Sequence, residues 1–171
     1  MKAIILAAGI GSRLGKPYPK PLTMLKTGET ILERQVQHLS KLVGEDNIII
    51  VVGFKKDLIM EAFPNQLFIY NNIYDITNTA KSLLLALRKI KNDDVLWLNG
   101  DVVFDENVLS QIIDFKGSCM AVNTYSVADE EVKYNVFEDG SIHQVSKIIT
   151  NGLGEAVGIN KISNNNLNQL I

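Results

Sequence analysis

The sequence lacks the cysteine pairs and the long apolar run that are typical of secreted or membrane-bound proteins. It contains one cysteine, Cys119, so no disulfide can form within the chain, and a reducing compartment is the natural location. The apolar run that opens the chain is interrupted at Gly9, which makes it too short for a signal peptide or a membrane span. We therefore expect a cytoplasmic protein without a membrane span.

The sequence also lacks a strong charge of either sign, and it has few histidines. The 17 basic and 19 acidic residues leave a net charge of -2, which argues against a nucleic-acid partner because such proteins present basic surfaces. A site for a single nucleotide remains compatible with this balance, since it needs only local charge. Neither His38 nor His143 has a neighbour that suggests a catalytic pair, so we expect both to be structural.

The chain does contain an alternation of strand-like and helix-like segments, and it is long enough for one hydrophobic core. This order predicts an α/β domain with a largely parallel sheet. Strands are expected at 3–6, 48–52, 67–70, 95–98, 120–124, 134–138, 141–148 and 156–162. Helices are expected at 80–90 and 105–115, and 164–168 reads as a helix start or a frayed end. A further helix opens at Thr30 with capping-box spacing, carries an apolar stripe and ends at Gly44; the stripe is formed by Leu32, Val36, Leu39 and Val43.

The segment 6–15 is rich in small residues and follows the first strand. The first strand delivers it to the carboxyl edge of the sheet, where α/β proteins bind ligands. Small residues let the backbone approach a ligand, and exposed N–H groups can cradle phosphates. Arg13 adds a planar cation, and Lys20 lies between Pro19 and Pro21, which stiffen the backbone around it. The candidate nucleotide-binding residues here are Leu6, Ala7, Ala8, Gly9, Gly11, Ser12, Arg13 and Lys20.

Other interpretations of this loop fit less well. A dinucleotide-binding loop needs glycine three residues after Gly11, where Leu14 stands. A Walker loop needs Ser or Thr after Gly15-Lys16, where Pro17 stands. A tight turn with surface cations is the remaining alternative.

A family resemblance rests on Leu6-Ala7-Ala8-Gly9-x-Gly11-x-Arg13-Leu14 followed by Pro19-Lys20-Pro21-Leu22. This pattern resembles the signature of the sugar-phosphate and choline-phosphate nucleotidyltransferases, and the resemblance covers essentially the whole chain. It implies a GT-A-like (Rossmann-like) domain with a mixed, mostly parallel sheet flanked by helices. It also implies that the loop wraps the phosphates of an NTP, which Arg13 and Lys20 neutralise. The insert 15–18 resembles that of the phosphocholine and 2-aminoethylphosphonate cytidylyltransferases.

Asp101 follows the predicted strand 95–98, again at the carboxyl edge of the sheet. A carboxylate there can hold Mg²⁺, although an aspartate beside a glycine is also common in turns. The resemblance implies that Asp101 takes the family's metal-binding position. The family usually has a second metal aspartate near the end of the domain, and neither Asp139 nor Glu155 stands in the expected context. The chain is therefore expected to be truncated or to lack that second ligand.

Two segments are candidates for the base and acceptor pockets. The resemblance places Asn78 and Ser82, with Thr77 as an alternative, against the nucleobase and sugar. Asn78 could also simply cap a helix. Lys147 resembles a lysine that contacts the acceptor phosphate, and Glu155 matches the acceptor-side segment, although Lys147 also fits an exposed strand lysine.

Aromatic residues provide a further candidate feature. Tyr18, Tyr74, Trp97 and Tyr125 could form a wall for a quaternary ammonium group, or they could belong to the core.

The sequence thus predicts one nucleotidyltransferase domain over 1–171, dependent on Mg²⁺. The favoured reaction transfers a cytidylyl group from CTP to a small phosphorylated or phosphonylated acceptor. Arg13, Lys20, Asp101 and Lys147 are the candidate catalytic residues. A sugar-1-phosphate nucleotidyltransferase using another NTP and a non-catalytic nucleotide-binding domain are the alternatives.

The two lysines of the loop should differ in importance. Lys20 is directed by flanking prolines, whereas Lys16 lies in the insert. Replacing Lys20 with alanine should weaken NTP use by about ten- to a hundred-fold, the range of a lost charge-assisted contact. The matched variant Lys16→Ala should change it much less. The measurement is the NTP dependence of turnover, and equal effects of the two variants would contradict the assignment.

Overall fold

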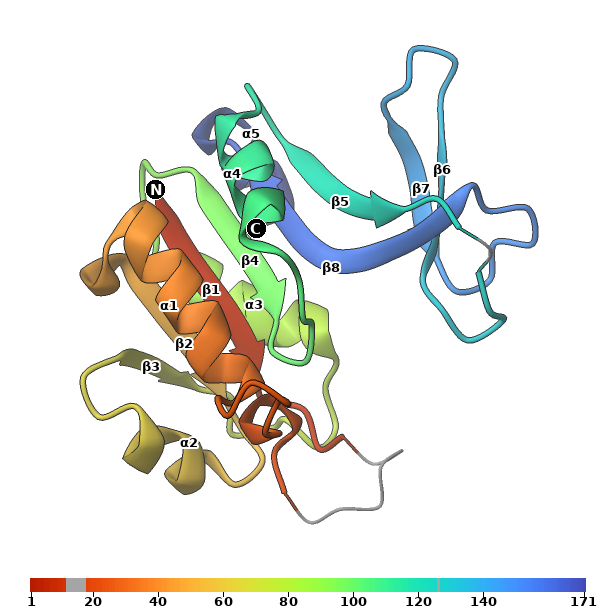
Figure 1. Cartoon of the computed structure of the whole chain (residues 1–171). Coiled ribbons are helices and arrows are strands. Elements are labelled where there is room, and N and C mark those ends of the chain that lie inside the picture. The colour runs from red at the N-terminus through yellow and green to blue at the C-terminus, as the bar shows by residue number, and fades with distance from the viewer. Residues whose placement is uncertain (12–17, 126) are drawn as a thin grey trace.

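A computed structural model describes residues 1–11, 18–125 and 127–171 of the chain (Figure 1). It confirms the predicted α/β class, with a mixed and mostly parallel sheet flanked by helices. Eight strands form one sheet, in the order β3-β2-β1-β4-β8-β6-β7, with β5 paired to β8. The strands are β1 (Lys2–Ala7), β2 (Ile48–Val52), β3 (Leu67–Tyr70), β4 (Val95–Asn99), β5 (Cys119–Asn123), β6 (Lys133–Val136), β7 (Ile142–Ser146) and β8 (Gly154–Ile162).

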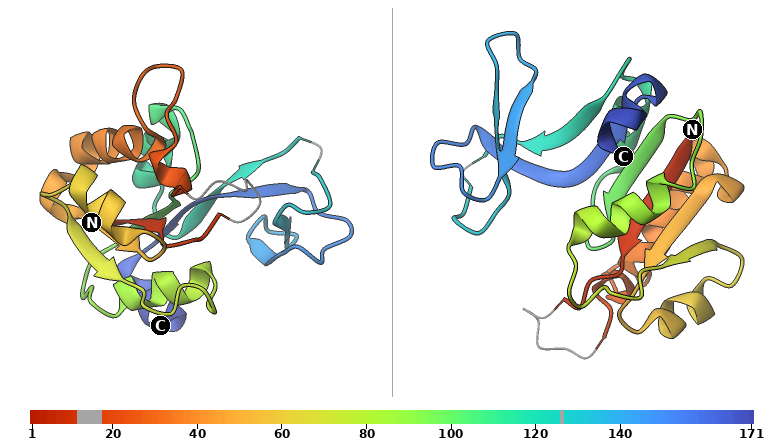
Figure 2. Two further views of the ribbon diagram at one scale, coloured as in Figure 1. Left: turned by 90° about the horizontal axis from the view of Figure 1, so that it is seen from below. Right: turned by 180° about the vertical axis from the view of Figure 1, so that it is seen from behind.

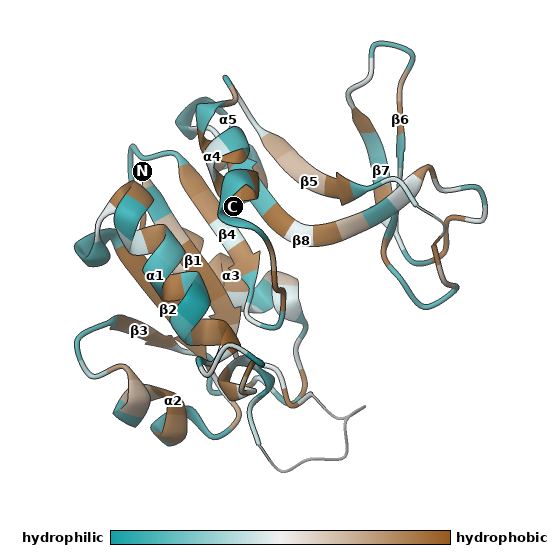
Figure 3. Cartoon of the chain, viewed as in Figure 1, coloured by the Kyte–Doolittle hydropathy of each residue, from teal (hydrophilic) through white to brown (hydrophobic). Residues whose placement is uncertain are grey.

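Strands β3, β2, β1 and β4 are parallel neighbours and form the centre of the molecule. Ile5 of β1 lies between Ile50 of β2 and Leu98 of β4. Strands β1, β2 and β4 are largely apolar and buried because helices cover both faces of the sheet there, whereas the edge strand β3 exposes Leu67 and Tyr70. Figure 3 shows this concentration of hydrophobic residues in the central strands.

In the described part of the chain, five α-helices lie on the two faces of this sheet (Figures 1 and 2). Helices α1 (Ile31–Val43), α2 (Lys56–Ala62) and α4 (Glu106–Asp114) contribute to one core cluster, and α3 (Thr79–Leu87) and α5 (Asn164–Leu170) contribute to the other. The alternation of β1 explains the division, since Ile5 belongs to the first cluster and Ile4 to the second. None of the helices in the described ranges is long and apolar enough to cross a membrane.

The predicted hairpin after the central sheet is confirmed. Strands β6 and β7 pair antiparallel around Asp139-Gly140, where the N–H of Phe137 donates to the carbonyl of Ser141. The hairpin projects away from the helices in both views of Figure 2.

The sequence missed α2 and placed some ends differently. Helix α2 has no side-chain cap, and the preceding Lys55 has a positive φ of 47°, so no start signal marks it. Helix α3 ends at Leu87 rather than at residue 90. The segment after Ser163 is a helix and not a frayed end.

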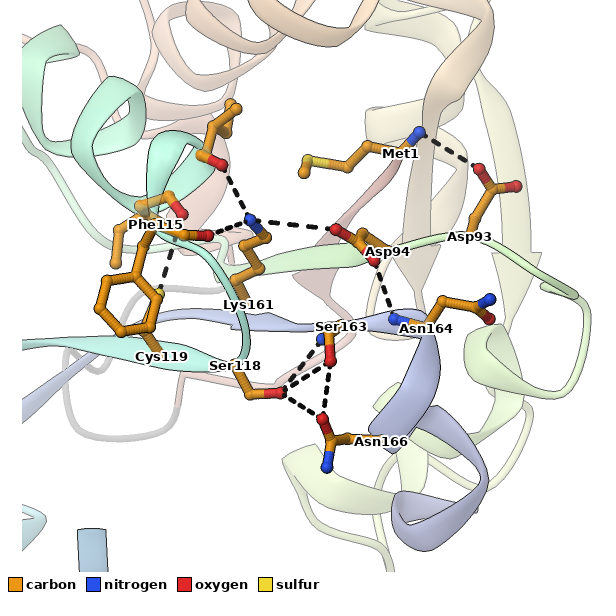
Figure 4. Close-up of polar contacts among 12 residues, drawn as sticks. Met1, Asp93, Asp94, Phe115, Ser118, Cys119, Lys161, Ser163, Asn164 and Asn166 are labelled. Atoms are coloured by element: carbon orange, nitrogen blue, oxygen red, sulfur yellow. Dashed lines mark hydrogen bonds and ion pairs between the residues drawn. The ribbon is translucent and has the colours of Figure 1, made fainter. Parts of the chain in front are cut away.

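The edge of the sheet where β4 begins carries a polar cluster around the buried Lys161, drawn in Figure 4. Lys161 is 5% exposed, and its Nζ donates to the carbonyls of Ile113 and Phe115 at the end of α4, at 2.8 and 2.7 Å. Asp94 accepts a hydrogen bond from the N–H of Asn164 at the start of α5. A lysine at a helix C-terminus satisfies its last carbonyls, so this cluster fixes α4 and α5 to the sheet.

Strand β8 passes very close to the end of β4. Leu98 pairs with Ile159, and Gly158 lies next to Asn99 with a φ of +80°. A Cβ on Gly158 would overlap the side-chain amide of Asn99. Glycine is therefore required twice here, by the backbone conformation and by the neighbouring side chain.

This double requirement can be separated experimentally with Gly140 as a control. Gly140 has nearly the same φ, +81°, but nothing lies within 4 Å of a Cβ placed on it. Gly140→Ala should lower the free energy of unfolding by about 1–2 kcal/mol, the cost of a left-handed conformation. Gly158→Ala should lower it further because Asn99 must also move. Urea unfolding of both variants measures this, and equal losses would contradict the contact.

Candidate functional site

A cavity of about 500 Å³ lies at the carboxyl ends of β1 and β4. This is the edge at which α/β sheets bind ligands. Its walls come from the loop after β1, the short 3₁₀ helix η2 (Lys20–Leu22), the segment that leads into α3 and the turn after β4. The lining residues are Leu6, Ala7, Ala8, Gly9, Ile10, Gly11, Lys20, Pro21, Tyr74, Asp75, Thr77, Asn78, Thr79, Ser82, Asn99 and Asp101.

Most of the residues expected to bind a nucleotide line this cavity. They are Leu6, Ala7, Ala8, Gly9, Gly11, Lys20, Asn78 and Ser82, together with the expected metal ligand Asp101. Ser12, Arg13 and Lys16 lie outside the described residues. The roles of all these residues in binding stay predictions, but the described ones that line the cavity meet the geometric condition for binding.

The glycines of the loop after β1 leave room for its neighbours. Gly11 has a φ of +65°, and a Cβ there would stand 3.0 Å from Cγ of Lys20. The stem of Lys20 therefore lies directly against Gly11. On the other side, the N–H of Phe54 donates to the carbonyl of Ala8 at 3.1 Å, which ties the loop to the end of β2.

Lys20 and Asp101 form an ion pair at the cavity. The distance from Nζ to Oδ2 is 3.4 Å, and the side chains are 29% and 46% exposed. The buried Pro21 and Leu22 anchor η2, so that Lys20 is presented from a fixed backbone. A half-exposed ion pair adds little to the free energy of folding. The pair matters for the site because it places a cation and a carboxylate side by side.

Buried Asn71 organises the wall on the α3 side. It is 1% exposed, and its Nδ2 donates to Oγ of Ser82 and to Oγ1 of Thr77, each at 3.0 Å. Its Oδ1 accepts from the N–H of Ile73 at 3.2 Å. Three hydrogen bonds from one side chain thus shape the segment between β3 and α3, a function that sequence reasoning missed because a single asparagine in a polar run gives no signal.

Asn78 caps a helix, and its contact with a nucleobase or sugar stays a prediction. Its Oδ1 caps α3 by accepting from the N–H of Lys81 at 3.1 Å, and the residue also lines the cavity. Ser82 is 5% exposed and accepts from Asn71, so part of its hydrogen-bonding capacity is used within the protein.

The expected acceptor residues do not line this cavity. Lys147 is exposed in the turn after β7, and Glu155 lies in β8, opposite Asn123 of β5 and Lys133 of β6. Burial raises the pKa of Glu155, and the nearby charge of Glu131 raises it further. Contact of Lys147 and Glu155 with an acceptor stays a prediction.

The aromatic wall considered from the sequence is not formed by the described residues, and Tyr18 is half-exposed and does not line this cavity. Tyr74 lines the cavity, whereas Trp97 lines a separate, more apolar groove of about 800 Å³ between β4, β8 and the β6–β7 hairpin. Tyr125 is 81% exposed. Trp97 lies in the middle of β4, whereas the cavity is lined by Asn99 and Asp101 at the end of that strand. His38 packs against Phe104 and His143 against Phe137, as expected of structural histidines.

A magnesium site must be judged from the donor set. Within the described ranges, no three His, Cys, Asp or Glu residues cluster in a way that would hold a metal ion. Mg²⁺ is usually held by one or two carboxylates together with substrate phosphates, so a single accessible carboxylate beside a phosphate-sized cavity fits it. Asp101 meets that description. Asp139 lines the apolar groove instead, and hydrogen bonds from Ser141 lower the pKa of its carboxyl.

Sequence relatives carry the same kind of domain. The chain is 36% identical over 121 residues to the CMP-5'-(3-aminopropyl)phosphonate synthase of Streptomyces rubellomurinus. The aligned region covers 66% of this chain and 19% of that protein. It is 34% identical over 138 residues to the bifunctional protein GlmU of Methanocaldococcus jannaschii, covering 78% of this chain and 30% of that protein. The chain thus corresponds to a third or less of the length of these two relatives.

Solved structures share the fold. The CTP:phosphocholine cytidylyltransferase of Streptococcus pneumoniae superposes with a TM-score of 0.74 at 23% identity, covering 98% of this chain and 73% of that one. A putative glucose-1-phosphate thymidylyltransferase of Bacillus anthracis gives a TM-score of 0.74 at 19% identity, with the same coverage. The sequence pattern of the MobA-like NTP transferase domain matches residues 3–153, and the chain therefore belongs to that family.

Proposed function

We propose that residues 1–171 form one nucleotidyltransferase domain, cytoplasmic in location, that transfers a cytidylyl group from CTP to a small phosphorylated or phosphonylated acceptor and releases pyrophosphate. The observation that carries this proposal is the pairing of Lys20 with Asp101 in a cavity built from the glycine-rich loop. Family membership supports nucleotidyl transfer in general. The names of two relatives, a CMP-aminopropylphosphonate synthase and a CTP:phosphocholine cytidylyltransferase, support the choice of CTP and of the acceptor class.

In this proposal the loop after β1 and Lys20 hold the triphosphate. Backbone N–H groups of the loop offer neutral donors, and the ammonium of Lys20 offers charge. Arg13 adds a second cation from the same loop. Asp101 would hold Mg²⁺, which when bound neutralises the charge that develops on the α-phosphate and on the departing pyrophosphate.

The reaction needs no covalent enzyme intermediate. An anionic oxygen of the acceptor attacks the α-phosphorus, a P–O bond forms, and the bond to the β-phosphate oxygen breaks with release of pyrophosphate. The nucleophile is already ionised, so the protein contributes position and charge neutralisation. Asn78 and Ser82 would contact the base and sugar, and Lys147 and Glu155 would contact the acceptor.

A second candidate is a sugar-1-phosphate nucleotidyltransferase that uses another NTP. The similarity to a putative glucose-1-phosphate thymidylyltransferase favours it, and the loop and metal assignments are the same in both. A domain that binds nucleotide without turnover is the third candidate, and nucleotide binding without pyrophosphate release would identify it.

The experiment that separates these candidates measures pyrophosphate release from CTP, UTP, dTTP, ATP and GTP with phosphocholine, 2-aminoethylphosphonate and hexose-1-phosphates. CTP should be preferred over UTP by about ten- to a hundred-fold in kcat/KM, because the wrong base leaves a buried polar group unpaired. Turnover only with a hexose-1-phosphate and an NTP other than CTP would support the second candidate instead.

Asp101→Asn should remove most turnover while the fold stays intact. The variant keeps the size of the side chain but loses the charge that would hold the metal, and we expect a loss of about a hundred-fold or more at saturating Mg²⁺. Asp139→Asn serves as the control, since that carboxylate lies outside the cavity. Circular dichroism checks the fold, and near-normal turnover of Asp101→Asn would refute the assignment.

A further inference from the structure

Gln35 is a polar residue in the buried face of α1. It is 1% exposed, and its neighbours on that face, Leu32 and Leu39, are fully buried. Glutamine at such a position is uncommon unless its amide has partners within the protein. Its partners lie at the candidate site, 64 and 67 residues further along the chain.

The side-chain amide of Gln35 holds both ends of the turn that carries Asp101. Its Nε2 donates to the carbonyl of Asn99 at 3.0 Å and to the carbonyl of Val102 at 2.8 Å. Carbonyl oxygens can only accept, so the amide must present its NH₂ group and the orientation of the side chain is chemically determined.

The turn itself is tightly constrained. The N–H of Val102 donates to the carbonyl of Asn99 at 3.3 Å, which closes a β-turn with Gly100 and Asp101 at its centre. Gly100 in turn donates to the carbonyl of Leu6 in β1 at 2.9 Å. The backbone of Asp101 is therefore fixed from three sides, by β1, by the turn and by α1.

The second polar atom of the amide, Oε1, indicates why a glutamine stands at this position. Among the described residues, Oε1 of Gln35 has no hydrogen-bond partner although it is buried. An unpaired buried acceptor is destabilising, and an apolar residue such as methionine or leucine would avoid it. A glutamine that buries one unpaired atom is best explained by its two donated hydrogen bonds.

We infer that Gln35 is a positioning residue for Asp101: from α1 it fixes the turn 99–102 so that the carboxylate of Asp101 stays beside Lys20 and the phosphate cavity. The inference rests on the proposed function, in which Asp101 holds the metal. Gln35 does not touch the substrate. It sets the metal affinity by limiting the positions that the carboxylate can adopt.

The test compares Gln35→Met with Gln37→Met. Both variants place the same side chain on α1, but Gln37 is exposed and contributes nothing to the turn. Titration of Mn²⁺ in the presence of a non-hydrolysable CTP analogue, followed by electron paramagnetic resonance, gives the metal affinity directly. Gln35→Met should weaken it by about ten- to a hundred-fold, the range found when a group that orients a metal ligand is removed. Gln37→Met should bind as the wild type does.

A kinetic and an exchange measurement distinguish positioning from general destabilisation. In Gln35→Met, raising the Mg²⁺ concentration should restore much of the lost turnover, and the amides of 100–102 should exchange with solvent faster while those of β1 do not. A variant that merely unfolds more easily would lose turnover equally at all Mg²⁺ concentrations, and this result would overturn the inference.

A wild-type measurement covers the case in which Gln35→Met does not fold. On addition of Mg²⁺ and the CTP analogue, the side-chain NH₂ resonances of Gln35 should shift, and those of Gln37 should not. If the wild-type protein binds metal and nucleotide but the Gln35 resonances do not change, the inference is overturned and the proposed function stands. The same holds if the wild-type protein binds both and Gln35→Met has normal metal affinity. A wild-type protein that binds neither Mn²⁺ nor the analogue would overturn the proposed function as well.

Discussion

The candidate site depends on the close approach of the ends of β1 and β4. The N–H of Gly100 donates to the carbonyl of Leu6 at 2.9 Å, beyond the point where the two strands pair in the sheet. A Cβ on Gly100 would stand 3.0 Å from that carbonyl and 3.0 Å from Cγ of Pro21. Glycine at this position therefore lets three segments meet, and the meeting brings Lys20 next to Asp101.

Buried polar groups have different tasks at the two edges of the sheet. At the carboxyl edge of the parallel strands, the amides of Gln35 and Asn71 bind loops that line the cavity. At the opposite edge, Lys161 satisfies the last carbonyls of α4 and helps to fix the helices. Each of these three side chains hydrogen-bonds to backbone or side-chain atoms that regular secondary structure leaves unpaired. The framework is thus stabilised at one edge and the site is shaped at the other.

Sequence patterns predicted the framework because they are repeated along each element. The apolar runs of the parallel strands, the capping box of α1 and the Asp139-Gly140 turn each involve several consistent residues, and all are present. Parallel strands carry their carboxyl ends to one edge, so the glycine-rich loop and Asp101 could be expected to meet although they lie far apart in the chain.

What the sequence could not predict depends on single residues. Gln35 is a single polar residue in the buried face of α1, and nothing in the neighbouring sequence shows that its partners are Asn99 and Val102. Tyr74 and Trp97 were grouped by type, but Tyr74 lines the cavity at the strand ends and Trp97, in the middle of β4, lines the apolar groove. Helix α2 lacks a cap and follows a residue with positive φ, so the usual start signals are missing. These features follow from tertiary contacts.

The central claim is that the cavity at the ends of β1 and β4 binds a nucleoside triphosphate. Backbone amide chemical shifts on titration with MgCTP test it most directly, because they report the location of binding independently of turnover. The account predicts shifts concentrated at Gly9, Gly11 and Asp101, with little change in the apolar groove around Met120 and Asn160. Shifts confined to the groove, or no shifts at millimolar MgCTP, would contradict it.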